Sequence, residues 1–185
     1  MLKIYNKYVE HGVDNYYSSQ WNKYYNPHES QIIDILQKYI VKYLQLFIQS
    51  DSCKILDFAC GDGLITKYLI AFNTQQNLQS NIVPRLIIEG SDPYFKNKYV
   101  TYDYSFKDII KGKTYGKFWD ICVCSYAYHL IEPKDQHDFL TQLALITKIF
   151  IVISPSKKII FDHPSWKIIE NVRINKISLI TIVLV

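Results

Sequence analysis

A short run of small residues joins a predicted strand to a predicted helix, and this junction carries the clearest chemical signal in the sequence. The strand has Asp57 near its end, and the loop that follows runs Ala-Cys-Gly-Asp-Gly over residues 59–63. Small residues are needed where a ligand lies against the backbone, because a side chain would occupy the same space. The helix that begins at Leu64 offers unpaired N–H groups in its first turn. The junction therefore predicts a ligand site.

Two common nucleotide-binding loops do not fit this junction. A dinucleotide-binding loop requires glycine at positions 59, 61 and 64, whereas the chain has Ala59, Gly61 and Leu64. The phosphate-binding pattern GxxxxGK[ST] is absent from the sequence. A nicotinamide-dependent oxidoreductase is therefore a disfavoured alternative.

The junction resembles instead the D-x-G-x-G-x-G loop of the class I S-adenosylmethionine-dependent methyltransferases, with Ala59 in place of the first glycine. Later segments resemble the same family in the family's order, and the likeness covers roughly residues 50–158. These segments are Ile-Ile-Glu-Gly-Ser-Asp-Pro at 87–93, Thr-Tyr-Asp-Tyr at 101–104, the stretch 118–130, and the helix and strand within 143–158.

The resemblance implies a role for each motif in binding S-adenosylmethionine. Asp92 would hold the two ribose hydroxyls, since a carboxylate can accept two hydrogen bonds from a vicinal diol. Asp103 and Tyr104 would flank the adenine, and Ser125 would lie beside the methyl group. The predicted cofactor-binding residues are Asp57, Ala59, Cys60, Gly61, Gly63, Asp92, Pro93, Asp103, Tyr104 and Ser125. Glu89 is a less favoured alternative to Asp92, because the interval of 29 residues from Gly63 to Asp92 is longer than the roughly 20 expected for a ribose-binding acidic residue.

The predicted activity is methyl transfer to a nitrogen, oxygen or sulfur atom of an unidentified small molecule, protein or RNA. His129 is the candidate base, since the ordinary pKa of histidine is about 6.5. The sequence after the fourth predicted strand, Ser125-Tyr-Ala-Tyr128, lacks the [DN]PP[YF] motif of amino-group methyltransferases. It also lacks the Pro-Cys of cytosine-C5 methylation.

Short apolar runs alternate with helical patterns, which is typical of an α/β fold. We predict a Rossmann-like, mostly parallel sheet flanked by helices. Its strands are predicted at Lys54–Phe58, Leu86–Glu89, Tyr99–Tyr102, Trp119–Ser125 and Ile149–Ser154. Helices are predicted at Ser30–Ile48, Leu64–Phe72 and Gln136–Thr147, with a polar loop insertion at 73–81. The 185 residues are predicted to form one domain, with an N-terminal aromatic segment and helix (1–50), a cofactor-binding core (51–158) and a C-terminal strand region (159–185).

The C-terminal end of the predicted sheet departs from the family. Two further strands usually form a hairpin there, whereas only Arg173–Val185 has a clear strand pattern. Either the strand pair is shortened, or Lys158–Phe161 supplies a brief strand. An apolar edge strand invites a protein partner, so a catalytically silent subunit is the alternative to an enzyme. Asp57, Gly61 and Asp92 favour the enzyme.

Two further segments allow two interpretations each. Tyr16–His28 is rich in aromatic residues, which could form a lid over the sulfonium cation of the cofactor or could pack the first helix onto the sheet. The lysine-rich stretch 96–117 could follow a phosphate backbone, but a solvated face is the favoured interpretation.

Composition narrows the class of protein. The formal net charge is +4 and only two residues are Arg, which disfavours a guanidinium-based nucleic-acid surface. The four cysteines have no zinc-type spacing, so no metal site is predicted. Cys122 and Cys124 alternate within an apolar run, and we expect them to be buried free thiols. The longest apolar run, Ile177–Val185, is shorter than the roughly 20 residues of a membrane span. We expect a soluble, cytoplasmic protein without a membrane partner.

Overall fold

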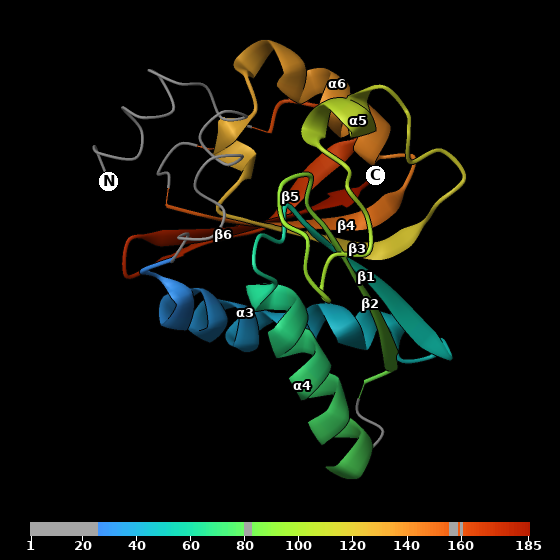
Figure 1. The fold of residues 1–185 in the computed structure, drawn as a ribbon, viewed down its shortest axis with the longest axis vertical. Helices are drawn as coiled ribbons and strands as arrows, with labels where there is room; N and C mark the ends of the chain where they lie inside the picture. The colour runs from blue at the N-terminus through green and yellow to red at the C-terminus, as the bar shows by residue number, and fades with distance from the viewer. Residues whose placement is uncertain (1–25, 80–82, 156–158, 160) are drawn as a thin grey trace.

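The computed structural model describes residues 26–79, 83–155, 159 and 161–185. They form a six-stranded sheet in the order β2-β1-β3-β4-β6-β5 (Figure 1). The strands are β1 (Ser52–Phe58), β2 (Arg85–Ser91), β3 (Trp119–Ser125), β4 (Thr147–Ser154), β5 (Trp166–Ile174) and β6 (Ile177–Leu184). The neighbouring pairs among β1 to β4 are parallel, and β6 is antiparallel to β4 and β5. The predicted α/β fold with a mostly parallel sheet is confirmed.

Helices cover both faces of this sheet. In Figure 1, α3 (Glu29–Leu44) and α4 (Leu64–Gln79) lie on one side, and α5 (Phe106–Ile110) and α6 (Pro133–Leu143) lie on the other. The short helices η2 (Gln45–Phe47) and η3 (Tyr128–Leu130) follow α3 and β3. No helix in the described ranges has both the length and the apolar character needed to cross a membrane.

Alternate residues of the central strands supply the two cores. Ile121 and Val123 pack with α3 and α4, whereas Cys122 and Cys124 pack on the α6 side. Successive side chains of a strand point to opposite faces, so a strand covered on both faces must be apolar throughout. All four cysteines are buried and free, which confirms the prediction made for Cys122 and Cys124.

The prediction of a loop insertion at residues 73–81 is wrong, because α4 continues to Gln79. Gln and Leu are good helix formers, so polarity alone did not end the helix. Asn73 also ties the helix to the sheet, since its Oδ1 accepts the Leu86 N–H at 3.1 Å. The last predicted helix is shifted toward the N-terminus: α6 begins at Pro133, a residue favoured at a first helical position.

The predicted strand Tyr99–Tyr102 is reduced to an isolated bridge between Ser91 and Tyr102. The chain instead crosses tightly over Gly90, whose carbonyl accepts the N–H groups of Thr101 and Tyr102 at 2.8 and 3.1 Å. A Cβ at Gly90 would lie 2.1 Å from the carbonyl oxygen of Tyr99. This close approach replaces a regular third strand.

The predicted shortening of the C-terminal strand pair is also wrong, because β5 and β6 form a full hairpin. Asn175 and Lys176 make the turn with φ values of 48° and 70°, as a two-residue hairpin turn requires. The alternative strand at Lys158–Phe161 does not form at Ile159 or Phe161, and residues 158 and 160 lie outside the described residues. The apolar β6 is paired on both sides, so it is not the unpaired edge that favoured a protein partner.

Candidate functional site

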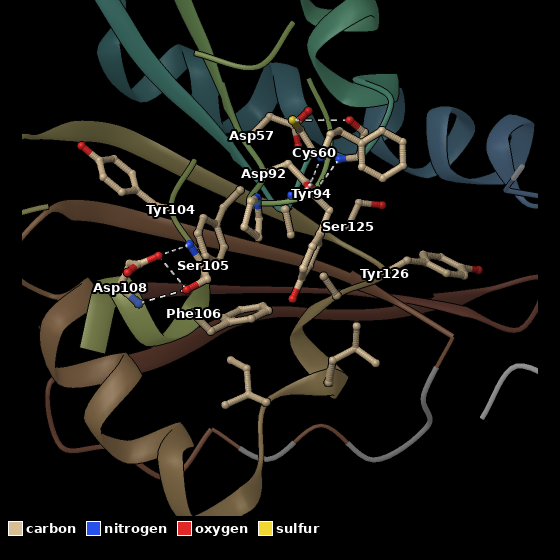
Figure 2. Close-up of a pocket in the computed structure, with 18 of the residues that line it drawn as sticks. Asp57, Cys60, Asp92, Tyr94, Tyr104, Ser105, Phe106, Asp108, Ser125 and Tyr126 are labelled. Carbon is tan, nitrogen blue, oxygen red and sulfur yellow. Dashed lines mark hydrogen bonds between the residues drawn. The ribbon is translucent and has the colours of Figure 1, made fainter. Parts of the chain in front are cut away.

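A cavity of about 560 Å³ opens where β1, β2 and β3 end. Ligand sites of open α/β sheets form at the carboxyl ends of the strands, where the strand order reverses. The walls come from the loop after β1, the loop after β2, the segment after β3 and the start of α5 (Figure 2). The volume lies within the range of about 300–1,000 Å³ that is typical of small-molecule sites.

The glycine loop exposes its backbone to this cavity at Gly61. Gly61 has φ +57°, and a Cβ built there would meet nothing within 4 Å. Ala59 adopts the same left-handed conformation with φ 56°, although it carries a side chain. Gly63 has another role: a Cβ there would lie 2.7 Å from the Cβ of Tyr99, so Gly63 permits packing and does not line the cavity.

Asp57 lies at the buried end of the cavity with 1% of its surface exposed. Its Oδ2 accepts hydrogen bonds from Thr66 N and Oγ1 at 2.9 and 2.8 Å. Its Oδ1 is buried and has no hydrogen-bond partner among the described residues. Burial raises the pKa of Asp57 to about 7, while the two bonds from Thr66 act in the opposite direction. The site thus contains an acceptor atom that no described group satisfies.

Asp92 connects the loop after β1 to the loop after β2 through hydrogen bonds. Its Oδ2 accepts the Gly61 N–H at 2.9 Å, and its Oδ1 accepts the N–H groups of Tyr94 and Phe95 at 2.9 and 3.1 Å. Burial raises its pKa, and these bonds partly offset that effect. Pro93 also lines the cavity. Glu89 does not, because its two oxygens bind Trp119 Nε1 and the Tyr102 hydroxyl at 2.6 and 2.9 Å.

The segment after β3 closes a third side of the cavity. Ser125 and Tyr126 both line it. Tyr126 has φ +59° and donates its N–H to the Ile153 carbonyl at 2.7 Å, which fixes the chain in a conformation that is unusual for a bulky residue. Cys60 also lines the cavity, and burial raises the pKa of its thiol, so it is not a thiolate at neutral pH.

Besides Gly63, two predicted site residues lie outside the cavity. Asp103 is exposed and borders a separate hollow of about 470 Å³ with Lys96 and Tyr102, although its neighbour Tyr104 does line the main cavity. His129 is exposed on η3 and does not line the cavity. Of the aromatic segment Tyr16–His28, residues 16–25 lie outside the described residues, so the choice between a lid and packing stays open.

Sequence reasoning missed the wall formed by α5 and the segment from η3 into α6. Ser105 caps α5 in a reciprocal pair with Asp108, and Phe106 at the helix start faces the cavity (Figure 2). The Ser-x-x-Asp spacing is the one available signal, because it resembles a capping box. Leu130 and Ile131 look like ordinary core residues in the sequence, yet both line the cavity.

No family model matches the sequence, and no curated protein matches it. Solved structures do match. A protein of Haemophilus influenzae assigned as a methylase aligns at 12% identity and a TM-score of 0.55, over 83% of this chain and 98% of its own. An rRNA methyltransferase of Streptomyces viridochromogenes aligns at 13% identity and 0.53, over 80% of this chain and 83% of its own.

An O-methyltransferase family protein of Burkholderia thailandensis aligns at 9% identity and a TM-score of 0.53, over 84% of this chain and 58% of its own. At such identities the likeness concerns the fold. The chain therefore has the fold of the class I S-adenosylmethionine-dependent methyltransferases, as the sequence predicted.

Proposed function

We propose that this protein binds S-adenosylmethionine in the cavity and transfers its methyl group to a nitrogen, oxygen or sulfur atom of an acceptor. The observation that carries the proposal is the backbone at Gly61, which faces the cavity between two buried carboxylates, Asp57 and Asp92. When bound, S-adenosylmethionine would supply an electrophilic methyl group on a sulfonium.

The residues of the cavity fit this cofactor in charge and shape. S-adenosylmethionine carries an ammonium and a sulfonium, and Asp57 offers a buried oxygen without a partner. An ammonium group can donate a hydrogen bond to that oxygen and also balance the charge of the buried carboxylate, and a neutral or anionic ligand cannot do both. The open space over Gly61 admits a ligand against the backbone, where a side chain at that position would interfere.

Each lining residue has a proposed role. Asp92 accepts bonds from three backbone N–H groups, and a carboxylate has about four acceptor sites, so one site remains for a ribose hydroxyl. Tyr104 would pack beside the adenine, and Ser125 would border the methyl group. His129 does not line the cavity, and we leave it out of the proposed site. The chain then works by positioning the acceptor, which is a large part of catalysis in transfer reactions.

A catalytically silent subunit is the second candidate, and cofactor binding distinguishes it from the enzyme. Calorimetry with S-adenosylmethionine should show saturable binding to the wild-type protein, and a silent subunit that has lost its site should show none. Gly61→Val should weaken that binding at least about thirtyfold, because the branched side chain would occupy the ligand's place.

Gly116→Val is a matched control for this experiment. Gly116 also has a positive φ (+81°) and open space around its missing Cβ, but it does not line the cavity. Both variants therefore introduce backbone strain of the same kind, a β-branched residue at a positive φ. Gly116→Val should bind as the wild type does. If Gly61→Val binds as well as Gly116→Val, the ligand does not approach the glycine loop and the proposal fails.

A further inference from the structure

The outer part of the cavity has walls that the proposed cofactor residues do not supply. Phe106 and Ile110 of α5 form one apolar wall, and Leu130 and Ile131 form another. Ile131 is only 6% exposed, so this side is well packed. Tyr94, from the loop after β2, extends toward Phe106 in the same space (Figure 2). Apolar surfaces of this kind suit a compact aromatic or aliphatic body.

Carboxylates surround these apolar walls. Asp108, Glu132 and Asp135 line the cavity, and Lys107 is the one basic residue among its described lining residues. Asp108 is held by Ser105 and paired with Lys113, and Glu132 is paired with Lys134 at 2.9 Å. Asp135 is half-buried and forms no hydrogen bond or ion pair through its carboxylate with another described residue.

We infer that the outer cavity binds a small acceptor with an apolar body and a positively charged group, and that Asp135 pairs with that charge. The inference deepens the proposed function and rests on it. Asp135 lies in the first turn of α6, four residues after Ile131, and lines the same cavity as Leu130 and Ile131, so one ligand can meet both features. The Oδ1 of Asp57 is already assigned to the positive charge of the cofactor, so Asp135 is the carboxylate that remains for the charge of the acceptor.

The same observations disfavour a nucleic acid as the acceptor. Phosphate backbones are held by Lys and Arg, and no Arg lines the described cavity. Within the lysine-rich stretch, Lys113 is engaged by Asp108, and Lys117 lies over the Tyr102 ring at 4.4 Å from its centroid. The acids at the cavity would repel phosphates that approached a bound base. Binding of RNA is therefore tested as the competing result in the experiment below.

The test uses two probes that share one apolar body and differ in charge, phenethylamine and 3-phenylpropionate. Calorimetry on the full-length protein with S-adenosylhomocysteine present should show phenethylamine binding at least about tenfold more tightly, as a charge-assisted contact predicts. Asp135→Asn should remove this preference. Asp138→Asn should keep it, because Asp138 is on the same helix with 71% of its side chain exposed and does not line the cavity.

The outcomes separate this inference from the proposed function. If S-adenosylmethionine binds but the two probes bind equally or not at all, or if Asp135→Asn keeps the preference, the acceptor inference is wrong and the proposed function stands. Tight binding of a short RNA hairpin that competes with phenethylamine also overturns it. If S-adenosylmethionine itself does not bind, the proposed function fails and the acceptor inference fails with it.

Discussion

Replacing Asp57 by Asn should make the protein more stable at neutral pH and weaken its binding of S-adenosylmethionine. The amide keeps an oxygen that can accept the two bonds from Thr66. It removes the negative charge, whose burial is the main reason that the pKa of Asp57 is raised to about 7. If Asp57 serves the cofactor's positive charge, the chain sacrifices stability for binding at this position, as functional sites commonly do.

The magnitude follows from the pKa. Asp57 has a pKa of about 7 in the fold against 3.8 for an ordinary aspartate. The folded state therefore holds the proton between these values while the unfolded state has lost it, so wild-type stability falls as pH rises through this window. Each pKa unit corresponds to about 1.36 kcal/mol. Between pH 5 and 8, the free energy of unfolding of Asp57→Asn relative to wild type should rise by ~3 kcal/mol.

Thermal unfolding of both proteins at pH 5, 6, 7 and 8 measures this difference. For a chain of this size, ~3 kcal/mol corresponds to a relative gain in Tm of ~6–12 °C. Comparing the two proteins at each pH cancels the other groups that titrate. Calorimetry at pH 8 should show that the variant binds S-adenosylmethionine at least about tenfold more weakly. A Tm difference that stays constant from pH 5 to 8 would refute the buried, proton-binding Asp57 described above.

Three further substitutions test the loops around the cavity. Ala59→Gly should raise the free energy of unfolding by ~1 kcal/mol in denaturant titrations, because Ala59 has φ 56° and glycine adopts this conformation without strain; a loss of stability would contradict the left-handed conformation. Gly90→Ala should lower it by ~3 kcal/mol, since the Cβ would meet the Tyr99 carbonyl, and an unchanged Tm would contradict that contact. Asp92→Ala should weaken S-adenosylmethionine binding by ~2 kcal/mol. It should also destabilise the fold by ~2–4 kcal/mol, because three backbone N–H groups lose their acceptor. An unchanged affinity in calorimetry would remove Asp92 from the site.

The sequence predicted the loops of the site because their chemistry restricts the residue types. Gly61 needs a positive φ and an open face. Asp57 lies near the end of β1 and Asp92 directly follows β2, and the ends of these neighbouring parallel strands meet at one edge of the sheet. Such positions leave a pattern that can be recognised without a structure. Gly63 shows the limit of that pattern, because it is required by the ring of Tyr99 and not by the cavity.

The remaining features depend on tertiary contacts that local patterns do not record. The predicted strand Tyr99–Tyr102 does not form, because the N–H groups of Thr101 and Tyr102 both donate to the carbonyl of Gly90. Exposed polar residues such as Thr74 are compatible with both a loop and a helix, so the end of α4 could not be placed. Phe106 and Leu130 could not be predicted as site residues, since an apolar residue at a cavity has the same local sequence pattern as an apolar residue in a core.

Amide chemical-shift mapping with S-adenosylmethionine tests the central claim most directly, because it locates the ligand on the chain without requiring an acceptor. The account predicts saturable changes concentrated at the glycine loop, at Asp92–Phe95 and at Ser125–Ala127, which are three of the segments that border the cavity. Changes that are absent at saturating cofactor, or that centre on the separate hollow around Lys96 and Asp103, would contradict it.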